Sequence, residues 1–212
     1  MPDFTLINPY DSPGQWYRGN LHTHTSASDG RNTPEAMAQW YAQHGYDFLA
    51  LTDHHRITLL EGFQSDMLLI PGAEIGSVDV VAIGIRGALP EDSGDIAHSV
   101  RLAKQLGGIA FVAHPYWWGL SADRLAQHPG LIGLEVFNNV CHYLNGKGLS
   151  SSIWDELLQR GLRLWGLAAD DAHGLDESRF GRSQVGQAWV MVKAAAKEER
   201  AILQALRRGA FY

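Results

Sequence analysis

Apolar runs and amphipathic segments alternate along the chain, and this alternation constrains its fold more than any other feature. Short apolar runs bounded by glycine, proline or polar residues predict buried strands, and segments with apolar residues at helical spacing predict helices. The expected strands are residues 16–21, 47–52, 67–70, 78–85, 109–113, 131–137, 162–169 and 185–192, and the expected helices are residues 34–44, 93–106, 121–127, 151–160 and 197–208. Strands joined by helices pair in parallel, and about seven such units suit a closed barrel better than an open sheet.

The composition limits the function classes that remain open. The chain has 212 residues, 45% of them hydrophobic and 19% charged, which predicts a single α/β domain with a sizeable core. A net charge of −6 argues against general nucleic-acid binding, because a phosphate backbone requires a basic surface. The single cysteine, Cys141, allows no internal disulfide.

The chain shows no sign of export or of a membrane segment. Its start lacks a basic segment followed by an apolar run, and no stretch of about 18 apolar residues occurs, so we expect a cytoplasmic protein with no membrane partner. Residues 1–16 are irregular and contain several prolines, and we expect them to form a lead-in to a domain spanning residues 17–212.

Side chains that bind metals well follow the ends of the expected strands. His22 and His24 are two residues apart, so both point to the same face of an extended segment and can hold one ion. Asp29, five residues later, could reach a second ion. The set that lies just beyond strand ends comprises His22, His24, His54, Glu74, His114, Asp171 and His173. Each alone is explained by a capped or solvated strand end, but the carboxyl ends of barrel strands meet at one rim, so the set predicts a metal centre.

The order and spacing of these motifs resemble the PHP (polymerase and histidinol phosphatase) superfamily from about residue 17 to the C-terminus. The resemblance rests on His22-x-His24 with Ser28-Asp29-Gly30, Thr52-Asp53-His54, Pro71-Gly72-x-Glu74, Ala113-His114-Pro115 and Asp171-x-His173. Glu135 to Asn138, Gly186-x-Ala188-Trp189 and the segment Ala205 to Gly209 further resemble the branch that includes carbaryl hydrolase.

The resemblance implies a distorted seven-stranded (β/α) barrel, similar to a TIM barrel, with two or three divalent ions at the carboxyl-end rim. It implies that His22, His24, Glu74 and Asp171 hold one ion, and that Glu74 bridges to a second ion which His114 also binds. Asp29, His54 and His173 would hold the third. Mixed imidazole and carboxylate ligands suit zinc, manganese or iron rather than calcium.

One position departs from the superfamily pattern. Asp79 stands where members usually carry a histidine in the strand after the glutamate. An aspartate ligates through oxygen, so either the second site survives with an altered metal preference or its ion is weakly held. His142, after the next strand, could compensate, although a loop histidine is more often solvated.

The predicted reaction is metal-assisted hydrolysis of a phosphomonoester or phosphodiester, because bound divalent ions can lower the pKa of water to about 7. No Gly-x-Ser-x-Gly motif supplies a serine nucleophile. Asp171 or His173 could carry the proton to the leaving group, and His55 is a second choice. A hydrolase of carbamate, amide or carboxylic ester bonds and an inactive accessory domain both remain open.

The substrate is expected to be a small molecule, and a phosphorylated one if three ions bind. Asp29, Glu74, Asp79 and Asp171 bring four negative charges, so two divalent ions leave the site neutral and three leave it at +2. Other candidates for substrate contact are two arginines in a loop, an amide and the aromatic residues after His114: Arg179, Arg182, Asn138, Tyr116, Trp117 and Trp118.

Overall fold

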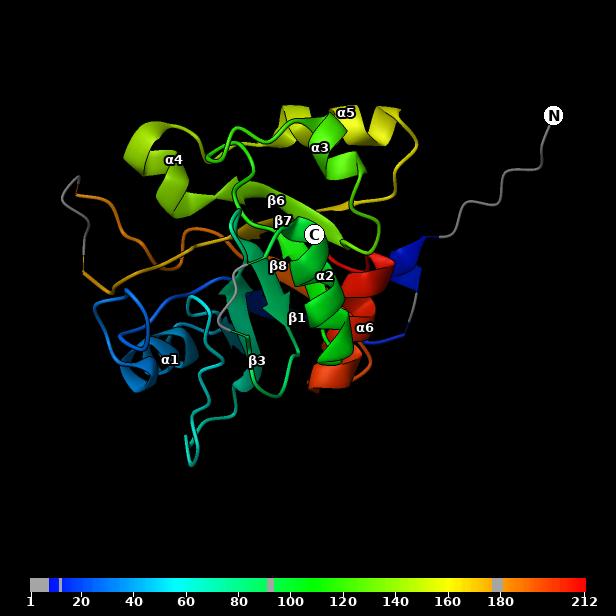
Figure 1. Cartoon of the computed structure of the whole chain (residues 1–212). Helices are drawn as coiled ribbons and strands as arrows, with labels where there is room; N and C mark the ends of the chain where they lie inside the picture. Colours follow the sequence, from blue (N-terminus) through cyan, green and yellow to red (C-terminus); the bar gives the residue numbers. More distant parts are fainter. Residues whose placement is uncertain (1–7, 12, 91–93, 177–180) are drawn as a thin grey trace.

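An eight-stranded mixed sheet forms the centre of the computed structural model, which describes residues 8–11, 13–90, 94–176 and 181–212 (Figure 1). The strands follow the order β7-β6-β5-β4-β3-β2-β1-β8 across the sheet. Their bounds are β1 Gln15–Asn20, β2 Phe48–Leu51, β3 Leu68–Ile75, β4 Val80–Ile83, β5 Ile109–Val112, β6 Gly133–Asn138, β7 Trp165–Ala169 and β8 Val190–Ala194. The two end strands, β7 and β8, lie close together without pairing in the described residues, so the sheet is a nearly closed barrel.

The expectation of seven parallel strands is wrong in number and in direction. Four pairs are parallel, but β4 runs antiparallel to both β3 and β5, and β8 runs antiparallel to β1. Only residues 76–79 join β3 to β4, and this connection reverses the chain because a parallel crossover needs about a dozen residues or more. The strand β8 begins at Val190, opposite Gly19 near the carboxyl end of β1, and runs back to Ala194, opposite Gln15.

The helices occur close to where the periodicity predicted them, with one addition. Thr33 caps α1 by accepting a hydrogen bond from the backbone N–H of Ala36, and Pro34 occupies the first helical position, as expected. The short α4, about two turns long, was not predicted. Residue 93, where the second helix was expected to begin, lies outside the described residues. The bounds are η1 Pro9–Asp11, α1 Pro34–Gln43, α2 Ile96–Gln105, α3 Ala122–Ala126, α4 Asn139–Asn145, α5 Ser151–Gln159 and α6 Glu199–Arg208.

Buried side chains cover both faces of the central strands. Along β2, Phe48 and Ala50 belong to the core cluster that includes α6, whereas Leu49 and Leu51 pack in the cluster with α1. Alternate residues of a strand point to opposite faces, so one set fills the barrel and the other meets the surrounding helices. Leu203 of α6 lies among the interior residues, and α6 therefore closes the barrel end opposite the carboxyl-end rim.

The rim at the carboxyl ends of the parallel strands is held together by backbone pairing beyond the strands themselves. Thr23 pairs with Ala172, and His54 pairs with Glu74. These bridges link the segments after β1 and β7, and the segment after β2 to β3. Among the described residues, no helix is long and apolar enough to cross a bilayer.

Candidate metal centre

All nine side chains predicted as metal ligands converge at this rim, where each belongs to at least one group of three or more potential ligand atoms. They come from the segments after β1, β2, β5 and β7, from β3 and from the β3–β4 turn. Glu74 lies within β3 rather than beyond it, because this strand continues through Pro71 and Gly72 to Ile75. At Gly72 a Cβ would lie 3.0 Å from the side chain of Thr52, just after β2, and 3.0 Å from the backbone oxygen of Ala82 in β4, so the glycine allows the strands to approach closely here.

The central group consists of His22 Nε2, His24 Nε2, Glu74 Oε2 and Asp171 Oδ1. The separations between these atoms are 3.1 Å for the two nitrogens, 3.2 Å from each nitrogen to Glu74, and 3.3 and 3.1 Å to Asp171. Four ligands placed tetrahedrally about 2.0–2.1 Å from a zinc ion lie about 3.3 Å from one another. The distances that join the two histidine nitrogens to each other and to each carboxylate are therefore close to the ligand spacing around one such ion.

Two further groups adjoin the central one. His114 Nε2 lies 3.4 Å from Glu74 Oε1, 3.7 Å from Asp171 Oδ2 and 3.9 Å from Asp79 Oδ2. On the outer side, Asp29 Oδ2 lies 3.3 Å from His173 Nε2 and 3.7 Å from His54 Nε2. Because Glu74 presents one oxygen to the central group and the other to His114, its carboxylate is placed to serve two ions at once.

Unpaired buried atoms test whether the site fits metal ions. Both carboxylate oxygens of Glu74, Asp171 Oδ1 and His24 Nδ1 are buried and lack a hydrogen-bond partner. A buried polar atom left unpaired costs about 1–3 kcal/mol, and more when it is charged. Divalent cations would satisfy the three carboxylate oxygens, so the donor set fits the group that the sequence predicts.

The electrostatics of the metal-free centre point the same way. Although burial lowers them, nearby carboxylates raise the pKa of His22 well above its usual range and the pKa values of His24 and His114 to about 9. Burial raises the pKa values of Glu74 and Asp171, but the neighbouring histidines, above all His22, lower them more. Both pKa values therefore lie well below their usual range. Protons thus balance the buried carboxylates where cations would otherwise do so.

Backbone strain concentrates at the same rim. In the described chain, four residues other than glycine have a positive φ, namely His55 (51°), Asp79 (46°), His114 (27°) and Asp171 (56°). Such conformations cost about 1–3 kcal/mol each and persist where the surroundings over-determine them. Three of the four are predicted ligands, which indicates that the chain is bent to aim their side chains inward.

A buried carboxylate that was not predicted as a site residue connects three ligand segments. Glu135 is fully buried and accepts hydrogen bonds from His22 Nδ1 (2.8 Å), from the backbone N–H of His114 (2.9 Å) and from Asn138 Nδ2 (2.8 Å). The Asn138 amide also lies 3.1 Å from Asp171 Oδ2. Because Glu135 accepts a hydrogen bond from the Nδ1–H of His22, the lone pair of this ring is at Nε2, in the central group.

Two more buried carboxylates organise the loops around the ligands. Asp53 accepts hydrogen bonds from Thr25, Ser28 and Thr58, and it thereby shapes the loop that carries Asp29. Asp170 accepts from Tyr41 and from three consecutive backbone N–H groups, those of residues 186–188. Burial raises the pKa of Asp170 to about 6, although the hydrogen bonds from these four donors act to lower it. Asp53 and Asp170 each stand next to a predicted ligand in the sequence, and this adjacency is the signal that would have identified them.

The structure places the other predicted residues in different surroundings. Asn138, expected to contact substrate, is fully buried in the Glu135 network. His55 and Arg182 are exposed and do not line the cavity at the centre, and Arg179 lies outside the described residues. Tyr116 is exposed, and its neighbour Trp117 lines the cavity instead.

The cavity at the centre has a volume of about 220 Å³ and two kinds of wall. One wall consists of the ligand side chains, and the other is apolar, formed by Trp117, Val140, Cys141 and Leu144. Among its lining residues in the described chain, none is a lysine or an arginine.

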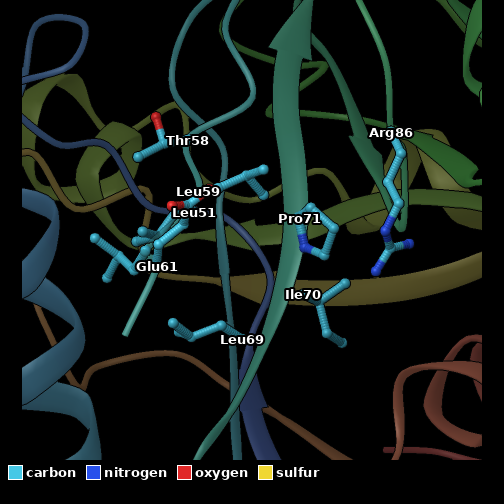
Figure 2. Close-up of a pocket in the computed structure, with 9 residues that line it drawn as sticks. Leu51, Thr58, Leu59, Glu61, Leu69, Ile70, Pro71 and Arg86 are labelled. Atoms are coloured by element: carbon cyan, nitrogen blue, oxygen red, sulfur yellow. The ribbon is translucent and has the colours of Figure 1, made fainter. Parts of the chain in front are cut away.

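A separate cavity of about 190 Å³ lies along β3, and Figure 2 shows Leu51, Leu59 and Leu69 on one side of that strand with Arg86 on the other. Arg86 is paired with both oxygens of Glu199, at 2.7 and 2.6 Å. This second cavity has one acidic side chain and no histidine or cysteine in its lining, so it offers no comparable metal chemistry.

No family model matches the chain, and no curated protein matches it either. Among solved structures, a two-domain protein of Bacteroides vulgatus containing a predicted PHP-like metal-dependent phosphoesterase is 20% identical, with a TM-score of 0.71 over 99% of this chain and 68% of that one. A candidate metal-dependent phosphoesterase of Bifidobacterium adolescentis is 16% identical, with a TM-score of 0.60 over 90% and 96% of the two chains. The lesion-specific endonuclease PfuEndoQ of Pyrococcus furiosus is 15% identical, with a TM-score of 0.63 over 91% of this chain and 56% of its own. The chain shares the fold of these proteins and spans about half of the endonuclease.

Proposed function

We propose that this protein is a divalent-metal-dependent phosphoesterase of the PHP superfamily that acts on small phosphate esters. The observation that carries the proposal is the central group, in which two histidine nitrogens from one segment lie 3.1–3.3 Å from each other and from carboxylates of two other segments, close to the ligand spacing around one ion. The PHP-like description of the Bacteroides neighbour supports it, as do the motifs in the sequence.

The chain's own residues account for binding and orientation. Bound divalent ions would act as Lewis acids and supply an activated water. The Nδ1 atom of His173 lies 2.8 Å from the backbone oxygen of Asp171 and donates to it, which leaves the lone pair of His173 at Nε2, facing Asp29. We assign proton transfer to the leaving oxygen to Asp171 or His173, since both line the cavity and His55 does not.

The charges of the site favour an anionic substrate only when three ions bind. The lining supplies no cationic side chain, so the negative charge of a phosphate must be balanced by the ions themselves. Against the four carboxylates of Asp29, Glu74, Asp79 and Asp171, a third divalent ion supplies the net positive charge. We therefore propose three ions for the phosphoesterase, with zinc, manganese or iron as the metals that suit these ligands.

The shape of the site favours a small substrate with an apolar leaving group. The cavity is about 220 Å³, and Trp117, Val140 and Leu144 form the wall that faces the ligand side chains. An aryl or aliphatic group bonded to the phosphate would rest on this wall while the phosphate meets the ions. The small volume and the net charge of −6 favour a small molecule over the DNA on which the endonuclease neighbour acts.

A second candidate function is hydrolysis of neutral carbamates, amides or carboxylic esters. The observation that favours it is the absence of lysine and arginine from the described lining, since a site with two ions would be neutral. A third candidate is an accessory domain that binds metal without turnover.

The test is a substrate panel on metal-depleted protein reloaded separately with zinc, manganese or iron. Aryl phosphates, bis-aryl phosphates and aryl carbamates are compared, and bound metal is measured in each sample. We expect phosphate-ester turnover that rises with the third equivalent of metal and disappears in His22→Ala. Faster carbamate turnover at two equivalents would favour the second candidate, and no turnover with stoichiometric metal would favour the third.

A further inference from the structure

A cavity of about 560 Å³ lies at the end of the barrel opposite the metal centre. It is lined by residues at the starts of β5 and β7, where Gly108 and Ile109 lead into one strand and Trp165 begins the other. The metal centre lies at the carboxyl ends of these same strands. The two sites are therefore separated by the length of the barrel.

Four cationic side chains from three elements line this cavity, and no carboxylate does. Arg101 and Lys104 come from α2, Arg163 precedes β7, and Arg207 comes from α6, which Figure 1 shows beside α2. They represent four of the 17 lysine and arginine residues of a chain whose net charge is −6. The cavity is therefore locally positive, although the chain as a whole is negatively charged.

The four cavity cations form no ion pair with a carboxylate in the described residues. In the described residues, the ion pairs formed by arginine or lysine with carboxylates involve Arg86 and Arg160, and none involves the four cavity cations. Arg207 donates to the backbone oxygen of Gly108 at 3.2 Å and keeps its other donors. Lys104 and Arg207 stand in the last turns of α2 and α6, where the helix dipole favours cations. The helix dipole does not account for the positions of Arg101, in the middle of α2, and Arg163, outside any helix.

The remainder of the cavity lining is apolar. Val100, Leu131 and Ile132 contribute aliphatic surface, and Trp165 contributes an indole whose N–H is already donated to the backbone oxygen of Arg207 at 3.1 Å. A ligand that satisfies this lining must combine several negative charges with a body that tolerates apolar contact. A volume of about 560 Å³ is within the usual range for sites that take small molecules.

We propose that this basic cavity binds a small polyphosphate, with its phosphates on Arg101, Lys104, Arg163 and Arg207. The shared chemistry is two or more linked phosphates, and the source is either inorganic pyrophosphate or a nucleoside triphosphate. The nucleoside triphosphate would add contact between its base and the apolar lining, so it should bind more tightly than pyrophosphate.

The test uses the whole chain after dialysis against EDTA, with retention of the fold checked by circular dichroism. In the metal-free centre the buried carboxylates balance the protonated histidines, and the described lining contains no lysine or arginine, so the charge of this centre does not favour polyphosphate. Calorimetric titration with pyrophosphate and with ATP then reports on the basic cavity. We expect binding of both, weaker at high salt.

The decisive comparison is between two variants with the same change in charge. Lys104→Glu with Arg163→Glu removes two cavity cations, whereas Arg200→Glu with Arg208→Glu removes two exposed arginines of α6 that do not line it. We expect the first pair to weaken ATP binding at least tenfold and the second to change it less than twofold. Equal weakening by both pairs, no binding at millimolar concentration, or tighter binding of a duplex oligonucleotide than of ATP would each overturn the proposal. If the stripped protein unfolds, the same variants are compared in zinc-loaded protein, where any ATP bound at the metal centre is common to all variants and the difference between the two pairs decides.

Discussion

Replacing Glu135 by glutamine perturbs the metal centre without touching a proposed ligand. Glu135 accepts three hydrogen bonds, from His22, from the backbone of His114 and from Asn138, at 2.8 to 2.9 Å. Glutamine keeps the shape but has a single acceptor oxygen. At least one of the donors would therefore face an NH₂ group, and the ring of His22 would lose the charge that fixes its Nδ1–H.

The size of the effect follows from these contacts. A hydrogen bond to a charged group contributes about 1.5–3 kcal/mol, and loss of a carboxylate behind a ligating histidine lowers metal affinity about 10- to 100-fold, equivalent to about 1.4–2.8 kcal/mol. We expect a fall of that size in the affinity of the tightest ion. Asn138 remains hydrogen-bonded to Asp171 in this variant, so the whole site should not collapse.

The assay is competition with a fluorescent zinc chelator at fixed pH. Glu156→Gln is the matched control, because this glutamate is exposed and pairs with Arg160 far from the centre. Its affinity should equal that of the unmodified protein. An unchanged affinity in Glu135→Gln, with circular dichroism showing an intact fold, would refute the inference that Glu135 orients His22.

Three further predictions concern pH, the second ion and the substrate wall. The pKa values of His24 and His114 are about 9 in the metal-free fold, above the ordinary 6.5. Their protonation therefore stabilises the fold below about pH 6.5, and this stabilisation is lost as the pH rises through 9. The Tm of EDTA-treated protein should fall over this window, and a flat profile, or the same fall in zinc-loaded protein, would contradict the prediction. Asp79→Ala should lower the metal content by about one ion per chain, measured by elemental analysis, while Asp79→His should restore it; equal content in all three proteins would remove Asp79 from the site. Trp117→Ala should raise the KM for an aryl phosphate by about 2- to 12-fold and leave methyl phosphate unaffected. The control is Trp189→Ala, at an exposed tryptophan that does not line the cavity; an equal rise for both substrates would show that the wall does not hold the leaving group.

Local patterns in the sequence were sufficient to place most elements of the fold. Thr33 and Pro34 predicted the start of α1 because caps act within one turn. Apolar runs predicted the buried strands because both faces are covered. The direction of β4 and the place of β8 were not predicted, since strand pairing depends on partners far away in sequence and on connection length, which periodicity alone does not encode.

The candidate site was predictable in part for the same reason. Histidines and carboxylates that follow strand ends are visible as motifs, and the barrel brings those ends together. The role of Glu135 was not visible, because an acidic residue inside an apolar strand gives no indication of which imidazole it will meet. The apolar wall around Leu144 depended on α4, which was not predicted because Asn138 and Asn139 read as the polar end of the preceding strand.

The most direct test of the metal centre is a crystal structure of zinc-loaded protein with anomalous scattering measured on both sides of the zinc edge. We predict an anomalous peak within about 2.0–2.2 Å of His22 Nε2, His24 Nε2, Glu74 and Asp171, the distances at which zinc binds nitrogen and oxygen. An anomalous map without a peak among these four side chains, or with its strongest peak elsewhere, would contradict the account.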